Sequence, residues 1–292
     1  MTETKHTSAL PGGTAGVLAV LLAAGLAAGS IWDQPLSTAL YDGTNLFGRF
    51  FAAFGEYPMA LGAALAGGLL WAGRDTAHRA RGAWQAAGAV LLLVFAVLVG
   101  AFFPARYSFF PLAAEFLISI CAAAAAGCCG CRLGRRVGAE KARRAALFIF
   151  VFILSEYLAV TLVKELWSRP RFRLVALGTG AEFVPWWQPQ SPFRALMTAA
   201  GVRSEEFRSF PSGHTANAAL MLGLALLPRL DERLAGRERL LFWCGAAYAA
   251  VVALSRIIVG AHYLSDTVCG CAFTLAALYL TQRWLCGREK RQ

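Results

Sequence analysis

Charged side chains are scarce in this chain: 15% of its 292 residues are Asp, Glu, Lys or Arg, whereas 58% are hydrophobic. A soluble domain cannot bury that much apolar surface, so the shortage of charge excludes a soluble globular protein and predicts one that lies in a bilayer. Acidic residues are the scarcer kind, which gives a formal net charge of +11. Because the cations cluster between apolar runs, as they do in cytoplasmic loops of membrane proteins, they do not indicate nucleic-acid binding.

Metal-binding patterns are also lacking. The chain has four histidines and eight cysteines, and the cysteines show no paired zinc-type spacing. The sequence therefore predicts no metal site and no cofactor. We interpret the cysteines as small buried hydrophobic residues. Metal binding or acylation is an alternative for the cluster at 128–131, although no histidine or carboxylate accompanies its thiols.

Long apolar runs are what the chain has in abundance. About eight are long enough to span a bilayer, which predicts an all-α polytopic membrane helix bundle. The first resembles a signal peptide, but its charged leader is weak and its run is long, so we favour a retained helix. Small residues at Gly25/Gly29 and Ala64/Gly68 predict close helix packing. The predicted spans are 12–32, 57–73, 83–103, 111–131, 145–163, 211–227, 240–260 and 263–284.

Basic residues mark every second connection between these spans. This pattern predicts that both termini are cytoplasmic and that the other connections face outward. The outward connection 164–210 is long, basic and without strong periodicity, which indicates a functional segment. We interpret its aromatic residues Phe183, Trp186, Trp187 and Phe193 as anchors at headgroup level, in preference to substrate contacts. The basic connections contain Arg74, Arg79 and Arg81, then Arg132, Arg135, Arg136, Lys141, Arg143 and Arg144, and then Arg229, Arg233, Arg237 and Arg239.

Three polar stretches fall on the outward face, at 164–171, 210–214 and 255–266. In the second, Ser-Gly after a proline at a helix start directs backbone N–H groups toward an anion, and Gly213 lets the backbone approach closely.

The third stretch carries its own chemistry. A helix running from His262 places Asp266 one turn away, where its carboxylate hydrogen-bonds one ring nitrogen and leaves the other nucleophilic. Arg256 adds a planar fork of donors suited to phosphate oxygens. The three stretches therefore predict one anion pocket.

In this order, Lys-x6-Arg at 164–171, Pro-Ser-Gly-His at 211–214 and Ser-Arg-x5-His-x3-Asp at 255–266 resemble the three signature motifs of the type 2 phosphatidic acid phosphatase family. They also resemble the phosphate pocket of vanadium haloperoxidases and glucose-6-phosphatase; a haloperoxidase is disfavoured because that branch is soluble. The family usually has proline after the first-motif arginine, where this chain has Phe172. The spacing from Lys164 assigns that arginine to Arg171, with Arg169 as a neighbour.

The resemblance implies a six-helix phosphatase core, which we place at 145–292 after N-terminal helices at 1–144, two of them beyond the family core. It also implies metal-independent catalysis, in which His262 attacks phosphorus and forms a phosphohistidine while Asp266 orients it. His214 then protonates the leaving oxygen and later helps to activate water. The implied phosphate-binding residues are Lys164, Arg171, Ser212, Gly213 and Arg256.

A bilayer-embedded site of this kind suits a lipid substrate. The predicted function is a multi-pass cell-membrane phosphatase acting at the outer face on undecaprenyl diphosphate, phosphatidylglycerol phosphate, phosphatidic acid or a lipid A phosphate. A lipid phosphotransferase with the same intermediate is the first alternative. A non-catalytic lipid-binding relative is the second, and it is disfavoured because all the motif residues are present. We interpret Glu156 and Glu115, two carboxylates inside predicted spans, as structural partners of neighbouring helices.

Overall fold

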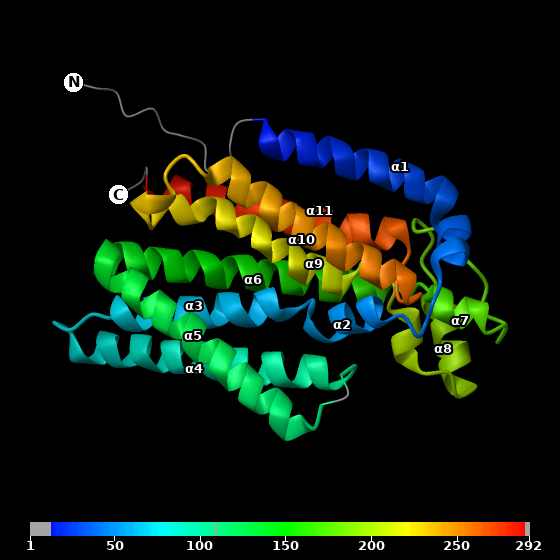
Figure 1. Ribbon diagram of the computed structural model, residues 1–292, viewed down its shortest axis with the longest axis horizontal. Helices are drawn as coiled ribbons and strands as arrows, with labels where there is room; N and C mark the ends of the chain where they lie inside the picture. The colour runs from blue at the N-terminus through cyan, green and yellow to red at the C-terminus, as the bar shows by residue number, and fades with distance from the viewer. Residues whose placement is uncertain (1–12, 109, 290–292) are drawn as a thin grey trace.

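The computed structural model describes residues 13–108 and 110–289, which fold as a bundle of long helices (Figure 1). These two ranges contain no strand, so the predicted all-α class is confirmed. The elements are α1 (Thr14–Leu40), α2 (Leu46–Phe54), α3 (Tyr57–Ala72), α4 (Arg79–Ala105), α5 (Leu112–Val137), α6 (Ala139–Trp167), α7 (Phe172–Ala176), α8 (Ser191–Ala199), η1 (Ser204–Phe207), α9 (Gly213–Ala219), η2 (Leu220–Arg229), η3 (Glu232–Leu234), α10 (Glu238–Ile258) and α11 (Leu264–Glu289), where η marks a 3-10 helix.

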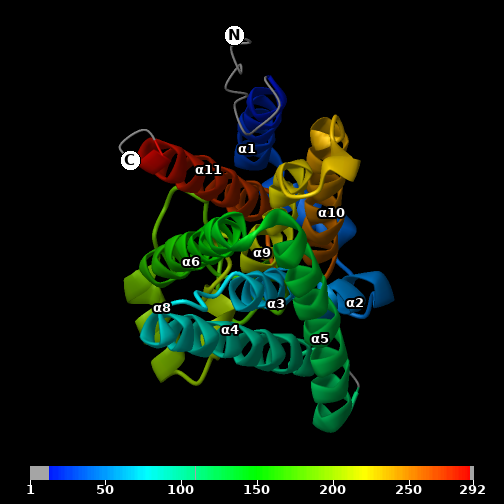
Figure 2. The same ribbon diagram turned by 90° about the vertical axis from the view of Figure 1, so that its left-hand side faces the viewer.

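Six helices in the described ranges are long and apolar enough to cross a membrane, so the chain is a helical membrane protein. Two of the eight predicted spans take a shorter form. The segment 57–73 is α3, of 16 residues, and the segment 211–227 is α9 continued by η2. Both pack among the other helices: α3 against α4, α5 and α6, and α9 against α3, α6, α10 and α11 (Figure 2). Because protein encloses them, they do not need the length of a lipid-facing span.

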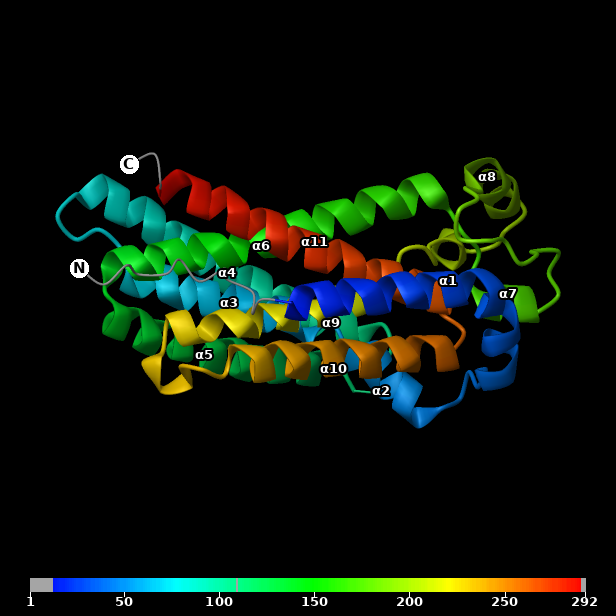
Figure 3. The ribbon, with the colours of Figure 1, turned by 90° about the horizontal axis from the view of Figure 1, so that it is seen from above.

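Small residues bring helix backbones close at two places. Gly68 of α3 lies against the backbone of Gly127 in α5, and Gly29 of α1 lies against Ser265, where an added Cβ would be 2.9 Å from the Cβ of Ser265. The close packing predicted from Gly29 and Gly68 is therefore confirmed. The second contact matters for the site, because it sets the second half of α1, which carries Asp33, beside the first turn of α11 (Figure 3).

The two ends of the bundle differ in character. The α3–α4 and α5–α6 connections and η3 lie at one end, on the left in Figure 1, and 13 of the 28 lysines and arginines lie in or beside them, at 74–81, 132–144 and 229–239. The short helices α7 and α8 and the beginning of α11 lie at the other end. The three motifs therefore lie at the end opposite the basic connections.

The interpretation of the cysteines as buried is wrong for several of them. Cys121, Cys128 and Cys129 of α5 and Cys244 of α10 are exposed, whereas Cys271 is buried. The exposed ones lie on the outer surface of membrane-spanning helices, where the surroundings are apolar whether protein or lipid supplies them, so a small hydrophobic thiol is accommodated on either side. The side chain of Cys286 lies outside the described residues.

Candidate active site

Hydrogen bonds around Ser209 join the three motifs. Its N–H donates to the carbonyl of Arg169 (3.1 Å), its carbonyl accepts from Nδ1 of His262 (2.6 Å), and its hydroxyl donates to Oδ2 of Asp266 (2.5 Å). The N–H of Ser212 also donates to the carbonyl of Asp266, at 2.9 Å. The structure thus brings the first, second and third motifs into one site, as the topology predicts.

His262 lies in the turn before α11, not inside the helix, and its side chain is buried. The carboxylate of Asp266 is 3.8 Å from Nδ1, too far for a hydrogen bond, so the Ser209 carbonyl takes the place predicted for Asp266. Geometry then assigns the ring proton to Nδ1 and the lone pair to Nε2. Burial lowers the pKa of His262 to about 3, with Lys164 and Arg171 acting in the same direction and Asp266 opposing. The imidazole is therefore neutral at pH 7.

Arg169 holds Asp266 in place. Its Nη1 donates to Oδ1 of Asp266 at 2.6 Å and its Nη2 donates to Oδ2 of Asp33 at 2.9 Å, and all three side chains are buried. The guanidinium also bonds the carbonyl of Val184 (2.8 Å) and lies 4.1 Å from the ring centroid of Tyr263. The donors of Arg169 are therefore used within the protein, which leaves Arg171 as the neighbouring cation for a ligand.

Asp33 is missing from the predicted site. Besides Arg169, its carboxylate accepts from the backbone N–H of Ser265 at 2.9 Å, in the first turn of α11, where a helix favours negative charge. A signal was available in the sequence, since a carboxylate beside a long apolar run in a membrane helix is usually functional. For Ser209 no such signal exists, because its bonds to Arg169 and His262 are made by its backbone.

The pocket contains buried cations with unused donors. Arg256 is 1% exposed and Arg171 7%, and Nε of each has no hydrogen-bond partner among the residues described. Nζ of Lys164 donates to the carbonyls of Arg208 (3.0 Å) and Pro211 (2.6 Å). Burying cations without matching acceptors is costly, so a pocket of this kind is suited to an anion that supplies them.

His214 occupies the first turn of α9, where Ser212 is the N-cap and its Oγ accepts from the N–H of Thr215 at 3.3 Å. Nε2 of His214 contacts the carbonyl of Ala52 in α2 at 3.0 Å. Burial lowers the pKa of His214 well below its usual value, and Arg256 lowers it further. Both predicted catalytic imidazoles are therefore buried, and the charge of Arg171 lowers the pKa of each.

Gly213 leaves room for the predicted first-motif lysine. A Cβ added there would lie 3.4 Å from Cε of Lys164, so a larger side chain at 213 would press on the ammonium group. The sequence predicted that Gly213 lets the backbone be approached closely, and in the structure the side chain of Lys164 makes this approach.

Two of the four loop aromatics cover the Arg169 network. Phe183 lies 5.4 Å from the Arg169 guanidinium, and Trp186 packs against Phe210 and donates from Nε1 to the hydroxyl of Ser30 at 3.0 Å. Trp187 is 52% exposed. Their role as headgroup-level anchors stays a prediction.

Within the part of the chain that the structure describes, neither intramembrane carboxylate shows the expected pairing with a neighbouring helix. The hydroxyl of Ser108, in the connection between α4 and α5, donates to Oε1 of Glu115, whereas Oε2 of Glu115 has no hydrogen-bond partner among the described residues. Glu156 is buried, and its Oε2 has no hydrogen-bond partner in the described part of the chain. The predicted pairing of Glu156 with a neighbouring helix is therefore not formed by Oε2 with any described residue.

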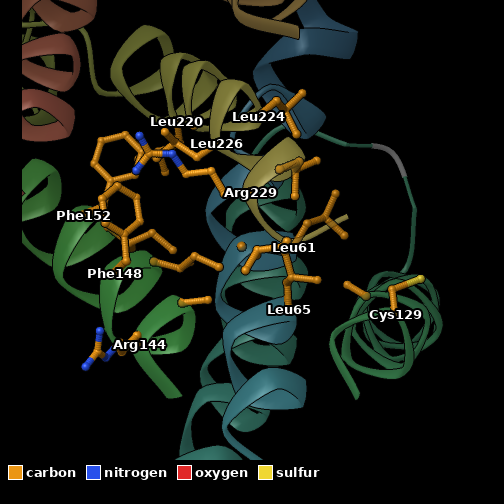
Figure 4. A pocket seen from close by; sticks show the side chains of 18 of the residues that line it. Leu61, Leu65, Cys129, Arg144, Phe148, Phe152, Leu220, Leu224, Leu226 and Arg229 are labelled. Carbon is orange, nitrogen blue, oxygen red and sulfur yellow. The ribbon is translucent and has the colours of Figure 1, made fainter. Parts of the chain in front are cut away.

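A separate cavity of about 1180 Å³ lies between α3, α5, α6 and η2. Leu61 and Leu65 of α3 and Phe148 and Phe152 of α6 face it, with Cys129 of α5 across from them (Figure 4). No motif residue lines this cavity. Within residues 13–108 and 110–289, no group of three or more His, Cys, Asp or Glu side chains is placed to hold a metal ion.

The family model of the PAP2 superfamily matches residues 144–289, a segment that includes all three motifs and makes up half of the chain. Searches of curated proteins and of solved structures give no match. The helices α1 to α5 precede the matched segment, yet Asp33 and the carbonyl of Ala52 reach the site from them. Since the motifs that define the family meet in one buried pocket, and the match spans half the sequence, the chain belongs to the PAP2 superfamily, whose members are usually phosphatases.

Proposed function

We propose that this protein is an integral membrane lipid phosphatase that cleaves a phosphomonoester or pyrophosphate through a phosphohistidine on His262. The observation that carries the proposal is the neutral, buried imidazole of His262 beside Arg171 and Arg256, two cations whose Nε atoms have no hydrogen-bond partner among the described residues. A phosphoryl group supplies both the acceptors that the cations lack and an electrophile for Nε2.

The reaction follows from where these groups lie. Nε2 of His262 attacks phosphorus, the P–N bond forms as the P–O bond to the lipid breaks, and His214 gives its proton to the leaving oxygen. Water then attacks the phosphohistidine while His214 takes up a proton, which releases inorganic phosphate and restores His262. The groups that hold the phosphate oxygens are Lys164, Arg171, Arg256, the hydroxyl of Ser212 and the N–H of Gly213.

Asp266 acts on the charge of His262. Its carboxylate is 3.8 Å from Nδ1, close enough to favour the positive charge that the ring gains on attack, while the Ser209 carbonyl fixes the ring orientation. Arg169 keeps the carboxylate in that position. Positive charge for the transition state comes from side chains, so we propose that the reaction needs no metal ion.

The position of the motifs within the helix bundle supports a lipid substrate at the outer face. The motifs lie at the end opposite the basic connections, and the positive-inside tendency places those connections in the cytoplasm. Both termini are then cytoplasmic, and the site faces the periplasm or the extracellular side. The substrate classes are undecaprenyl diphosphate, phosphatidylglycerol phosphate, phosphatidic acid and a lipid A phosphate.

Phosphate release from the purified full-length protein in detergent tests the proposal. The panel contains the four lipid classes and a soluble sugar phosphate, each with and without EDTA, and the His262→Ala variant is the control. We expect release from at least one lipid, unaffected by EDTA and abolished in His262→Ala. An acid-labile phosphoryl label trapped on another residue would refute the nucleophile assignment. Transfer of phosphate to an added lipid, without release, would identify a phosphotransferase, and no turnover on any substrate would favour a non-catalytic relative.

A further inference from the structure

Glu56 places a carboxylate against His214 from outside the segment that the family model matches. It is the N-cap of α3, the second of the two residues between α2 and α3, and its side chain is 14% exposed. Oε1 of Glu56 is 3.6 Å from Nδ1 of His214 and accepts a hydrogen bond from Nδ2 of Asn217 at 3.0 Å. Asn217 lies one turn after His214 on α9, so Glu56 contacts the helix that carries the histidine at two points.

A carboxylate is unexpected in a pocket for phosphate, because it repels the substrate. The surroundings of His214 give it a purpose. Nε2 faces the carbonyl of Ala52 and Nδ1 faces Glu56, so both ring nitrogens face acceptors, which suits an imidazole that carries two protons. Glu56 thus favours the charged form that a proton donor needs.

The other groups around His214 act against that form. Arg256 from α10, Arg171 before α7 and His262 before α11 each disfavour a positive charge on the ring, and the ring of Tyr107, from the α4–α5 connection, lies 5.7 Å from it in a T-shaped arrangement. Burial raises the pKa of Glu56, although Asn217, Arg256 and Lys164 oppose the rise. The pKa of the Glu56 carboxyl group is raised and that of the His214 imidazole beside it is lowered, so the two pKa values approach each other. Two such groups can hold one proton between them.

We propose that Glu56 is a positioning residue for His214: its carboxylate, 3.6 Å from Nδ1, stabilises the protonated imidazole by its charge and so keeps on the pair the proton that the leaving oxygen receives. The proposal rests on the proposed role of His214 in lipid phosphate cleavage. In the step, the Nδ1–H proton passes to the lipid oxygen as its bond to phosphorus breaks, Glu56 stays ionised, and the attacking water later returns a proton to Nδ1. The α2–α3 segment is thereby part of the proton-transfer machinery.

The dependence of the rate on the leaving group tests this role in the full-length protein. The change is Glu56→Gln, and the substrates are the best alkyl lipid phosphate of the panel and p-nitrophenyl phosphate, whose leaving group departs without a proton. We expect kcat/KM for the lipid to fall about 10- to 100-fold, less than the roughly 10²–10⁴-fold that general-acid catalysis contributes because His214 itself remains, and the value for the aryl ester to fall less than about threefold. In the His214→Ala background, Glu56→Gln should add no further loss on the lipid.

Glu115→Gln is the matched control, since Glu115 is a buried carboxylate that contacts Ser108 and is not a motif residue; its two rates should stay close to wild type. Equal losses on both substrates for Glu56→Gln, or no loss on the lipid, would overturn the proposal. The pKa of His214, measured by NMR with labelled histidine, gives a readout independent of turnover: it should fall in Glu56→Gln, and an unchanged value would also overturn the proposal. A wild-type protein that cleaves neither substrate would refute the proposed function instead.

Discussion

Arg169 and Arg171 lie two positions apart, and their contacts predict opposite consequences when each is replaced by methionine. Arg169 is fully buried and bridges Asp33 and Asp266. Arg171 is also buried, but its Nε has no partner among the described residues, and its charge acts on both predicted catalytic histidines. Methionine removes the charge from either position and keeps much of the volume.

The expected magnitudes follow from those contacts. Arg169→Met leaves two buried carboxylates without their cation, and breaking a buried pair in this way costs about 3–5 kcal/mol of unfolding free energy. Arg171→Met removes a charge that makes no ion pair with the described residues, so stability should stay nearly the same or rise. If Arg171 gives two charge-assisted hydrogen bonds of about 1.5–3 kcal/mol each to the transition state, its loss lowers kcat/KM roughly 10²- to 10⁴-fold.

Two measurements on the same detergent-purified samples separate the arginines: kcat/KM for phosphate release, and denaturation followed by tryptophan fluorescence. Arg169→Met should unfold earlier and lose activity, because Asp266 is no longer held. Arg171→Met should lose activity and unfold like wild type. If Arg171→Met is the destabilised variant, or if it keeps full activity while Arg169→Met stays stable, the division of roles between the two arginines is wrong.

Three further outcomes are expected. The pH profile of kcat/KM should be bell-shaped, because activity falls on the acid side as His262 gains a proton and on the alkaline side as His214 loses one. Since burial lowers the pKa of both histidines, the optimum should lie below about 6.5, the usual histidine pKa. A rate that rises steadily with pH would contradict this prediction. Gly213→Leu should lower kcat/KM, because a Cβ at 213 already touches Cε of Lys164 at 3.4 Å and the further atoms of leucine would displace the ammonium group; unchanged phosphate release would show that the position of Lys164 does not depend on this glycine. Asp33→Asn should destabilise the protein by about 1–3 kcal/mol, since the amide is a poorer acceptor for the buried Arg169, and a denaturation midpoint equal to that of wild type would argue against the bridge.

Much of the site was predictable because the motif residues are recognised by type and order. The spacing of Lys164 and Arg171 separated the motif arginine from Arg169, and the structure gives these arginines different surroundings. The spacing of His262 and Asp266 predicted that they lie close, but it did not predict that a backbone carbonyl, that of Ser209, would take the direct bond to the imidazole. Local spacing gives proximity along one helix, whereas the hydrogen-bond partner depends on which other segment packs there.

The N-terminal helices illustrate the same limit. Their apolar runs predict that they are helices in a membrane, but nothing in their pattern predicts that Asp33 meets Arg169 or that Glu56 meets His214, contacts between residues more than a hundred positions apart in the chain. Those contacts exist because small residues such as Gly29 let α1 approach α11 closely and because α9 is enclosed among α3, α6, α10 and α11.

The sequence by itself determined that this protein lies in a membrane, that it is helical and which family it belongs to. The length of the apolar runs, the placement of the cations and the order of the three motifs are all properties of the chain alone. The tertiary structure alone decided which cations form ion pairs within the protein and which have hydrogen-bond donors left for a ligand. It also decided which carboxylates lie beside the two histidines. Pairing depends on distance and burial in three dimensions, and a buried charge is neutralised by whatever the packing brings within a few ångströms of it.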